Sequence, residues 1–319
     1  MHSLTTICES PRFTQLWETH FAKALCTRFE KKGLSADVLK LTTTQNKSYL
    51  VKLSCKSADY LQHRYELLCA TNHESALLPV TFSGTPYLCL NDEIIEVYPY
   101  IEGKTLNHHP SYQPVIEQLG KQIAILHWQL PSVDNFATGS LKLIPRSFQQ
   151  LAHEINAAQT MVLQNGSAKQ TLADEYLMAV RSLYPHSASL CSGLQKKIDN
   201  LSTQQLIHGD LHGDNIIIDI NSRLHLIDFN KMMLGPKVFD LAKFIACSLF
   251  SDSGEIDKKQ VKALLLGYQS QAVITVSEQK LLLPMILGLL LNGTWLLRKY
   301  LAEPEKSATY YDRTPRKLT

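Results

Sequence analysis

One short stretch constrains this 319-residue chain more than any other, because it interrupts a long run of helical patterns. From His208 to Phe229 the sequence reads HGDLHGDNIIIDINSRLHLIDF. Two apolar runs separated by the polar turn residues Asn221 and Ser222 predict a β-hairpin. Acidic and amide side chains stand just before the first run and at the end of the second. The stretch therefore predicts a hairpin with oxygen-bearing side chains at both of its ends.

The spacing of these polar residues fits what phosphoryl transfer from ATP requires, namely positioning, a group that orients or deprotonates a hydroxyl, and ligands for Mg²⁺. Asp210 is the candidate base or hydroxyl-orienting residue, and Asn215 lies at the spacing of a second metal ligand. Asp228 follows an apolar strand, and its carboxylate oxygen suits Mg²⁺. Asp and Asn are also common turn residues, so the prediction depends on the combined spacing. Asp214 is the alternative to Asn215, and the spacing favours Asn215.

At these residues the chain resembles the aminoglycoside phosphotransferase and choline kinase superfamily, small-molecule kinases related to protein kinases. Members commonly read HGD-L-H-x-x-N, then I-D-F or I-D-W, then G-P-x-x-x-D-L-A, which corresponds to Gly235–Ala242 here. Leu119–His127, LGKQIAILH, resembles the family's L-G-x-x-L-A-x-L-H helix. The resemblance implies ATP and Mg²⁺ as cofactors. It also implies that His208 and Asp240 support the catalytic loop structurally.

The resemblance further implies an α+β, two-lobed, protein-kinase-like fold, with a small β-rich N-terminal lobe and a larger, mainly helical C-terminal lobe. We expect residues 1–100 to form the nucleotide-binding lobe with a leading helix. Residues 101–319 would then carry the catalytic loop, the metal site and the acceptor pocket. The joint is expected at Tyr98–Leu106, where a strand gives way to a segment with Pro and Gly.

Two charged residues of the first lobe resemble the family's phosphate-binding pair. Lys52 lies on the second strand of a predicted hairpin, and Glu66 lies on the helix that follows it. In a kinase-like lobe such a lysine contacts the α- and β-phosphates and is held by the helix carboxylate. Lys56 and Glu74 form the fallback pair.

The remaining nucleotide contacts are expected at a loop and at the hinge. No G-x-G-x-x-G is present, but Asn46 and Ser48 fit the reduced phosphate loop of the superfamily. Backbone N–H groups of such a loop can still bind phosphates. The backbone near Glu96 and Tyr98 is expected to bind adenine.

Periodicity places the elements on both sides of this motif. Strands are predicted at Asp37–Leu41, Tyr49–Leu53, Pro79–Gly84 and Glu93–Tyr98. Helices are predicted at 11–32, 57–71, 112–130, 146–163, 168–184, 188–200, 238–250, 257–270 and 277–300.

Composition limits the partners and the compartment. A net charge of +3 with scattered Lys and Arg does not favour nucleic acid binding. Seven cysteines at wide spacing, with no C-x-x-C, and no secretory signal predict a reducing compartment, hence the cytoplasm. The apolar segment Leu281–Leu297 contains Pro284 and two glycines and is short for a membrane span, so we expect a buried helix and no stable membrane insertion.

The expected function is transfer of the γ-phosphoryl group of ATP to a hydroxyl of a small molecule. Aminoglycosides, choline or amino alcohols, homoserine-like compounds and sugars all remain open as acceptors. Two alternatives keep the fold: an inactive kinase-like scaffold protein, and a kinase that acts on a protein hydroxyl. The retention of Asp210, Asn215, Asp228 and Lys52 favours the enzyme.

Overall fold

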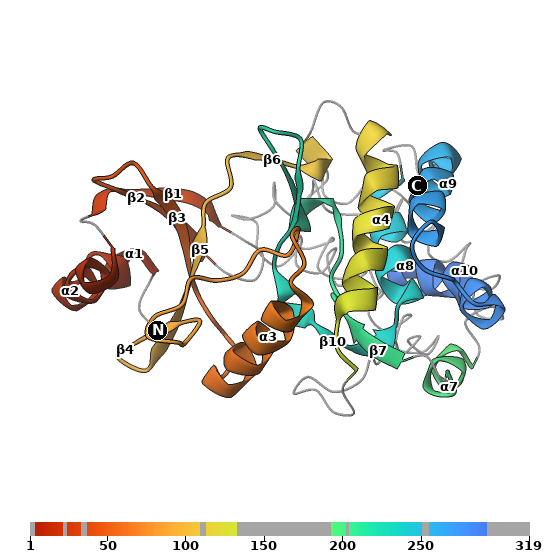
Figure 1. Ribbon diagram of the computed structural model, residues 1–319, viewed down its shortest axis with the longest axis horizontal. Coiled ribbons are helices and arrows are strands. Elements are labelled where there is room, and N and C mark those ends of the chain that lie inside the picture. The colour runs from red at the N-terminus through yellow and green to blue at the C-terminus, as the bar shows by residue number, and fades with distance from the viewer. Residues whose placement is uncertain are drawn as a thin grey trace, which may run out of the picture. The chain divides into compact units, whose positions relative to one another are not determined.

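The chain folds into two compact units, and each unit is built from three segments that are separated in the sequence (Figure 1). The computed structural model describes residues 4–21, 24–32, 37–108, 113–132, 193–201, 204–250 and 255–291. The first unit comprises Met1–Thr105, Gln129–Pro131 and Ile216–Asn230. The second comprises Leu106–Trp128, Ser132–Asn215 and Lys231–Thr319. The helices predicted at 146–163 and 168–184 lie outside the described residues.

A five-stranded antiparallel sheet dominates the first unit, with the strand order β1-β2-β3-β5-β4. Its strands are β1 (Ala24–Lys32), β2 (Asp37–Thr43), β3 (Ser48–Leu53), β4 (Leu88–Leu90) and β5 (Glu93–Pro99). The predicted hairpin of the second and third strands is confirmed, and so is the strand at β5. The register places Lys52 on β3 directly opposite Glu96 on β5.

Two sequence predictions in this unit are wrong. The helix predicted over 11–32 ends at His20, and residues 24–32 form β1 instead. Leu25, Thr27 and Phe29 also alternate with a period of two, so the same apolar residues satisfy a strand pattern. Pro79–Gly84 forms no strand beyond one bridge between Phe82 and Thr85, whereas the three-residue strand β4 was missed.

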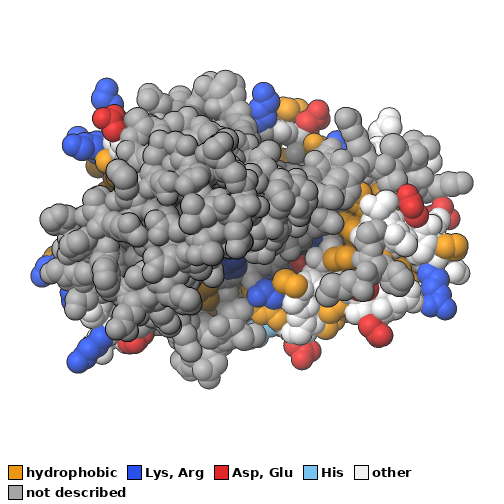
Figure 2. All heavy atoms as spheres, turned by 180° about the vertical axis from the view of Figure 1, so that it is seen from behind, with side chains coloured by type: hydrophobic (Ala, Val, Ile, Leu, Met, Phe, Trp, Pro, Cys, Tyr) orange, Lys and Arg blue, Asp and Glu red, His pale blue; other side chains and the backbone are white. Residues whose placement is uncertain are grey.

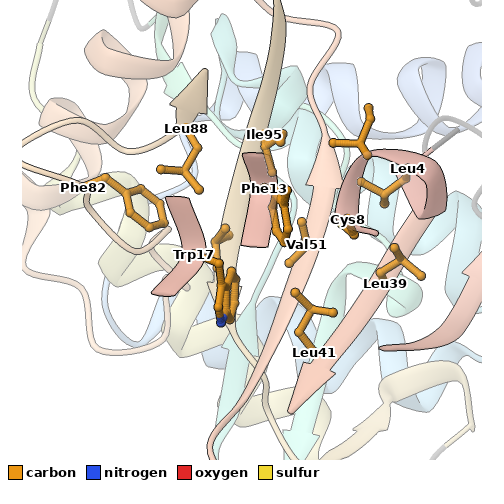
Figure 3. Close-up of a cluster of buried hydrophobic side chains, with 12 residues drawn as sticks. Leu4, Cys8, Phe13, Trp17, Leu39, Leu41, Val51, Phe82, Leu88 and Ile95 are labelled. Atoms are coloured by element: carbon orange, nitrogen blue, oxygen red, sulfur yellow. The ribbon is translucent and has the colours of Figure 1, made fainter. Parts of the chain in front are cut away.

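The core of the first unit lies between this sheet and two short helices, α1 (Leu4–Cys8) and α2 (Pro11–His20) (Figure 3). The Ser10 side chain caps α2 by accepting from the Phe13 N–H, and Pro11 occupies the first turn, where its missing N–H costs nothing. Trp17 of α2 is 1% exposed and stacks on Phe21 at 4.3 Å between ring centroids. Apolar burial of this kind supplies most of the stability that holds the sheet.

Helix α3 (Ala58–Thr71) follows the strand that carries Lys52, as predicted. Ser57 caps its N-terminus, and Asn72 ends it in the left-handed conformation. One face of α3 is buried at helical spacing, and its members are Tyr60, Leu61, Arg64, Leu67, Leu68 and Thr71. An arginine therefore stands in the middle of an otherwise mostly apolar stripe.

The predicted hairpin of the motif is confirmed and belongs to the first unit. Strands β8 (Ile216–Asp219) and β9 (Leu224–Leu226) pair antiparallel, and β6 (Gly103–Thr105) adds a third strand. A side chain at Gly103 would place its Cβ 2.2 Å from the Ile218 carbonyl oxygen, so the close pairing requires glycine.

The second unit is mainly helical. Its helices include α4 (Gln113–Gln129), α7 (Leu194–Asp199), α8 (Val238–Ser248), α9 (Lys258–Gln269) and α10 (Val276–Leu291). A two-stranded sheet joins β7 (Gln204–Ile207) to β10 (Met233–Pro236). Helices α4 and α9 cross in near backbone contact, because a Cβ at Gly120 would lie 2.2 Å from the Leu264 carbonyl oxygen. The helices predicted at 112–130, 238–250, 257–270 and the start of 277–300 are confirmed.

The apolar segment tested for a membrane span begins inside α10. Leu281 and Met285 are 3% and 0% exposed, and Pro284 lies within the helix. Across the described ranges, no helix combines the length and apolar character that a membrane crossing requires. Among the described residues visible in Figure 2, positively and negatively charged side chains are interspersed.

Candidate active site

The backbone of the HGD turn is set by its glycine. Gly209 follows β7 with a φ of +78°, in the left-handed region that side chains disfavour. A Cβ at this position would lie 2.1 Å from the carbonyl oxygen of Lys231. The turn that presents Asp210 therefore requires glycine for both backbone conformation and space.

A buried carboxylate, that of Asp240, stabilises the backbone of this turn through hydrogen bonds. Asp240, on the first turn of α8, accepts hydrogen bonds from the backbone N–H of His208 at 2.8 Å and of Gly209 at 2.9 Å. It also accepts from His127 Nε2 at 2.9 Å, and His127 Nδ1 lies 2.9 Å from the Tyr268 hydroxyl. Because a carboxylate only accepts, His127 carries its proton on Nε2 here.

These contacts also fix the charge of Asp240. Burial by itself raises the pKa of this carboxyl group, but the hydrogen bond from His127 and the nearby backbone N–H of Gly209 bring the pKa below its ordinary value. The side chain of His208 is 0% exposed, and its Nδ1 accepts from the backbone N–H of Asp210 at 3.3 Å. The loop is thus held by buried, hydrogen-bonded groups.

Two lysines contact the carboxylate of Asp210. Lys231 Nζ lies 2.8 Å from Oδ2, and Lys243 Nζ lies 3.3 Å from Oδ1. His212 Nε2 is 3.9 Å from Oδ2. Burial opposes ionisation of Asp210, yet Lys243, Lys231 and His212 together hold its pKa well below the usual range. The carboxylate is therefore ionised throughout the neutral range.

Asn215 closes the short 3₁₀ turn η2 (Gly213–Asn215) just before β8. Its Nδ2 donates to the backbone carbonyl of Asp210 at 2.9 Å, which orients the amide and leaves Oδ1 as its acceptor atom. Asp214 has a side chain that is 16% exposed and lies 3.9 Å from His212 Nδ1. A hydrogen bond thus ties the amide of Asn215 to the Asp210 backbone.

In the first unit, Asp228 stands in a strained conformation at the end of β9. Its φ of +62° is in the left-handed region, which is uncommon for a residue with a side chain. Lys52 Nζ lies 3.2 Å from its Oδ1. Strained residues of this kind cluster at functional sites, where the surrounding structure holds them in place.

The predicted pairing of Lys52 with Glu66 is not what the structure shows. Glu66 is exposed on α3, and its Oε1 accepts a hydrogen bond from Gln62 Nε2 at 2.8 Å. The reason is helical phase, since Glu66 lies two residues beyond Arg64, whose side chain occupies the buried face. The fallback Glu74 is exposed as well, and Lys56 Nζ lies 4.9 Å from the centre of the Tyr60 ring.

Arg64 instead reaches a buried carboxylate on β5. Its Nη2 donates to Glu96 Oε2 at 2.5 Å and to the Tyr98 hydroxyl at 3.1 Å, and Tyr98 donates to Glu96 Oε2 at 2.5 Å. Its Nη1 donates to Asn230 Oδ1, two residues after Asp228. Arg64 and Glu96 are 1% and 0% exposed. The side chains of Glu96 and Tyr98, which the sequence placed beside adenine through their backbone, thus form a buried charged network.

The second oxygen of Glu96 has a different environment. Its Oε1 is buried and has no hydrogen-bond partner among the described residues. Burial opposes ionisation of Glu96, but the charges of Lys52 and Arg64 lower its pKa below the ordinary value. A buried ionised oxygen without a hydrogen bond is costly, and Lys52 is the cross-strand neighbour of this residue.

The predicted phosphate loop is the turn between β2 and β3. Asn46 has a φ of +57°, and its N–H donates to the Thr43 carbonyl at 2.9 Å. The hydroxyls of Ser48 and Thr42 lie 3.0 Å apart. The turn is closed by its own backbone bonds, and the phosphate-binding role of Asn46 and Ser48 stays a prediction.

The comparisons with known proteins agree with this geometry. The sequence pattern of the phosphotransferase enzyme family matches residues 27–273. The chain belongs to the phosphotransferase enzyme family. The comparison with curated proteins finds no match.

Solved structures similar to this phosphotransferase share its fold at low sequence identity. An aminoglycoside phosphotransferase from Alicyclobacillus acidocaldarius subsp. acidocaldarius DSM 446 has a TM-score of 0.68 and 15% identity, over 97% of this chain and 94% of that one. Amicoumacin kinase hAmiN, in complex with AMP-PNP, Ca²⁺ and Ami, has a TM-score of 0.63 and 15% identity, over 99% and 96%. Choline kinase LicA from Streptococcus pneumoniae has a TM-score of 0.54 and 17% identity, over 96% and 97%. The expected kinase-like fold and the phosphotransferase class are confirmed.

Several residues of this phosphotransferase that contact the predicted site were missed from sequence. Arg64 could have been found from the buried periodicity of α3, which includes position 64 and excludes position 66. Lys243 lies one turn after Asp240 on α8, so it faces the same loop. Lys231 carried no such signal, because its contact with Asp210 depends on the turn at Gly209.

Proposed function

We propose that this phosphotransferase moves the γ-phosphoryl group of ATP to a hydroxyl group of a small molecule, with Mg²⁺. The observation that carries the proposal is the Asp210 turn, whose two preceding backbone N–H groups are bonded to buried Asp240. A carboxylate held this firmly can orient an acceptor hydroxyl, and orientation is most of what phosphoryl transfer requires of a protein.

In this proposal Asp210 orients first and accepts a proton late. Lys231 and Lys243 stabilise its ionised form, which makes it a weak base in the ground state. The hydroxyl proton becomes acidic only as the oxygen bonds to phosphorus, and Asp210 is then the acceptor. The step transfers the phosphoryl group to the hydroxyl oxygen, breaks the bond to the ADP oxygen and leaves the proton on Asp210.

The residues proposed for Mg²⁺ fit the ion. Asp228 and Asn215 offer carboxylate and amide oxygens, which are hard ligands, and Mg²⁺ usually takes one or two carboxylates together with phosphate oxygens. The ammonium of Lys52 at 3.2 Å from Asp228 Oδ1 indicates that this carboxylate already faces a cation. Bound Mg²⁺ would neutralise charge on the phosphates. The protein's part is to hold Asp228 in its left-handed conformation and Asn215 through its bond to the Asp210 carbonyl.

We assign to Glu96 the role that sequence gave to Glu66. If Asp228 held the metal ion, Lys52 would contact the phosphates in place of this carboxylate. Glu96 lies opposite Lys52 in the pairing of β3 with β5, and its Oε1 has no hydrogen-bond partner among the residues that the structure describes, so this oxygen could hold the ammonium. Arg64 fixes the other oxygen of Glu96 and also bonds Asn230, so the network positions Lys52 and the segment after Asp228 together.

The similar structures support the cofactors and leave the acceptor open. Amicoumacin kinase was solved with AMP-PNP and Ca²⁺, which supports a nucleotide and a divalent cation here. Aminoglycoside phosphotransferase and choline kinase differ in the compounds for which they are named, so the fold alone selects no acceptor. Described cysteines such as Cys8 and Cys55 are free thiols, which supports our placement of the enzyme in the cytoplasm.

The decisive experiment is a screen for ADP release by the purified protein with ATP, Mg²⁺ and a panel of hydroxyl compounds that spans sugars, amino alcohols, hydroxy acids and aminoglycosides. We expect at least one acceptor to be phosphorylated. Asp210→Asn should lower kcat for that acceptor by at least about 10²-fold and leave nucleotide binding nearly intact. Wild-type turnover by the variant, or no phosphorylated compound in the panel, would contradict the proposal.

A further inference from the structure

We propose that Lys231 and Lys243 form a cationic subsite beside Asp210 that selects acceptors with a negatively charged group near the reacting hydroxyl. The inference rests on the proposed function, because it takes Asp210 as the group that binds this hydroxyl. It narrows the acceptor from any hydroxyl compound to a class, hydroxy acids and sugar acids, and it disfavours amines.

The geometry places one ammonium on each oxygen of the Asp210 carboxylate. Lys231 Nζ lies 2.8 Å from Oδ2 and Lys243 Nζ lies 3.3 Å from Oδ1, with His212 Nε2 at 3.9 Å from Oδ2. The two lysines carry one more charge than Asp210 neutralises. An acceptor hydroxyl that binds Asp210 must take the place of one of them.

Exposure decides which lysine moves. The Lys231 side chain is 57% exposed, whereas that of Lys243 is 21% exposed and also hydrogen-bonds Cys247 one turn further along α8. Exposed ion pairs are weak, so the contact from Lys231 is the one that a hydroxyl displaces at little cost. Lys243 stays on the carboxylate. The displaced ammonium of Lys231 is then next to the bound acceptor and available for an anionic group on it.

The distances make the acceptor's own charge important. A hydroxyl bonded to Asp210 brings the atoms two or three bonds away to within roughly 4–6 Å of both ammonium groups, a range in which charges interact despite salt. A carboxylate there gains a partner in Lys231. An ammonium there meets two like charges, which is how specificity against a wrong ligand is commonly achieved.

The test uses two sets of acceptors, each with an anionic, a neutral and a cationic member of the same carbon skeleton. The first set is glycerate, glycerol and serinol, and the second is glucuronate, glucose and glucosamine. They are added to the acceptor panel, and kcat/KM is measured for every compound that is phosphorylated. We expect anionic acceptors to exceed cationic ones of the same skeleton by about tenfold or more, a difference that one such charge contact supplies.

Two variants locate the selectivity. Lys231→Gln should reduce the ratio of anionic to cationic kcat/KM by about fivefold to tenfold, mainly through KM. Lys243→Gln should reduce it further. Lys262→Gln, which removes an exposed lysine of α9, is the matched control and should leave the ratio unchanged. Lys231 is exposed, so its variant tests the inference even where Lys243→Gln does not fold.

The outcomes separate this inference from the proposed function. Cationic acceptors used as well as anionic ones, or an equal loss for both classes in Lys231→Gln, would overturn the subsite while the kinase activity stands. An equal loss would assign the lysines to the phosphoryl group instead. If no compound of any charge is phosphorylated, the proposed function falls, and the subsite falls with it.

Discussion

The two units each contain a charged cluster, and the clusters are built in opposite ways. In the first unit, Arg64 and Glu96 are 1% and 0% exposed and are joined by a bond of 2.5 Å, with Tyr98 closing the triangle. In the second unit, Asp210 is joined to Lys243 and to the largely exposed Lys231. One cluster is sealed from water, and the other opens to it at one side.

This difference in exposure indicates that the two clusters have different roles. A buried ion pair with several hydrogen bonds is expensive to break and therefore fixes geometry. An exposed ammonium on a carboxylate is replaced at little cost, so its place can be taken by a substrate group. We therefore read the Arg64 cluster as a positioning device for Lys52 and the Asp228 segment. The Asp210 cluster is the part that exchanges partners during the reaction.

The largest effect, a loss of folding stability, is expected when the buried ion pair of Arg64 with Glu96 is broken. Arg64→Met retains apolar volume but leaves the Glu96 carboxylate buried without its main partner, which should lower the free energy of unfolding by about 3–5 kcal/mol. Urea denaturation followed by circular dichroism measures it. The paired variant Arg64→Met/Glu96→Leu should recover much of the loss. A single variant as stable as the wild type would show that the cluster is not sealed.

The next effect concerns the metal. Asp228→Ala removes the one carboxylate assigned to Mg²⁺, so nucleotide binding should lose its dependence on Mg²⁺. Calorimetric titration with ATP, with and without Mg²⁺, tests this expectation. Asn215→Ala should weaken the Mg²⁺ dependence, whereas Asp214→Ala, one residue away, should not. The assignment fails if Asp228→Ala and the wild type respond equally to Mg²⁺.

The comparison also shows where sequence reasoning reaches its limit. Asp210, Asn215 and Asp228 lie in one continuous motif, so their spacing alone predicts a hairpin with oxygen ligands at its ends. Lys52 and Glu96 are far apart in sequence and become neighbours only through the register of β3 and β5, which no local pattern specifies.

Helix α3 shows a second kind of limit. The sequence offered an acid at the expected distance from Lys52, and Glu66 satisfied a family pattern. Helical phase excluded it, because the buried face of α3 passes through Arg64. A charged residue on a buried face violates the apolar pattern, and such violations are where functional clusters are found. The prediction that the first helix continues through residues 24–32 was wrong because the apolar residues there fit both the helical period and the strand period of two.

A smaller change, in kcat/KM, distinguishes Glu96 from Glu66 as the carboxylate that holds the ammonium of Lys52. Glu96→Gln should lower kcat/KM by about tenfold, since the amide cannot hold the ammonium as a carboxylate does. Combined with Lys52→Ala it should lose much less than the sum, because residues that act as one unit are non-additive. Glu66→Ala should change kcat/KM by less than about twofold and should add independently to Lys52→Ala, as expected of distant sites. Additive loss for Lys52 with Glu96 would return Glu66 to consideration.

The smallest effect comes from the open cluster and depends on pH. Lys231 contributes to the depressed pKa of Asp210 in the folded protein, whereas the unfolded carboxyl titrates near about 3.9. Since the folded state then binds fewer protons than the unfolded state between these two values, stability rises with pH through that window. The contribution is fully present above about pH 4 and is lost as the pH falls toward the folded pKa.

Lys231→Gln should therefore lower the free energy of unfolding by less than about 1 kcal/mol at neutral pH, because the ammonium is largely exposed. The difference in stability between the variant and the wild type should shrink below about pH 4. Urea denaturation of both proteins at neutral and acidic pH measures it, with Lys262→Gln as the control; a difference that grows in acid would show that Lys231 does not stabilise the ionised form of Asp210.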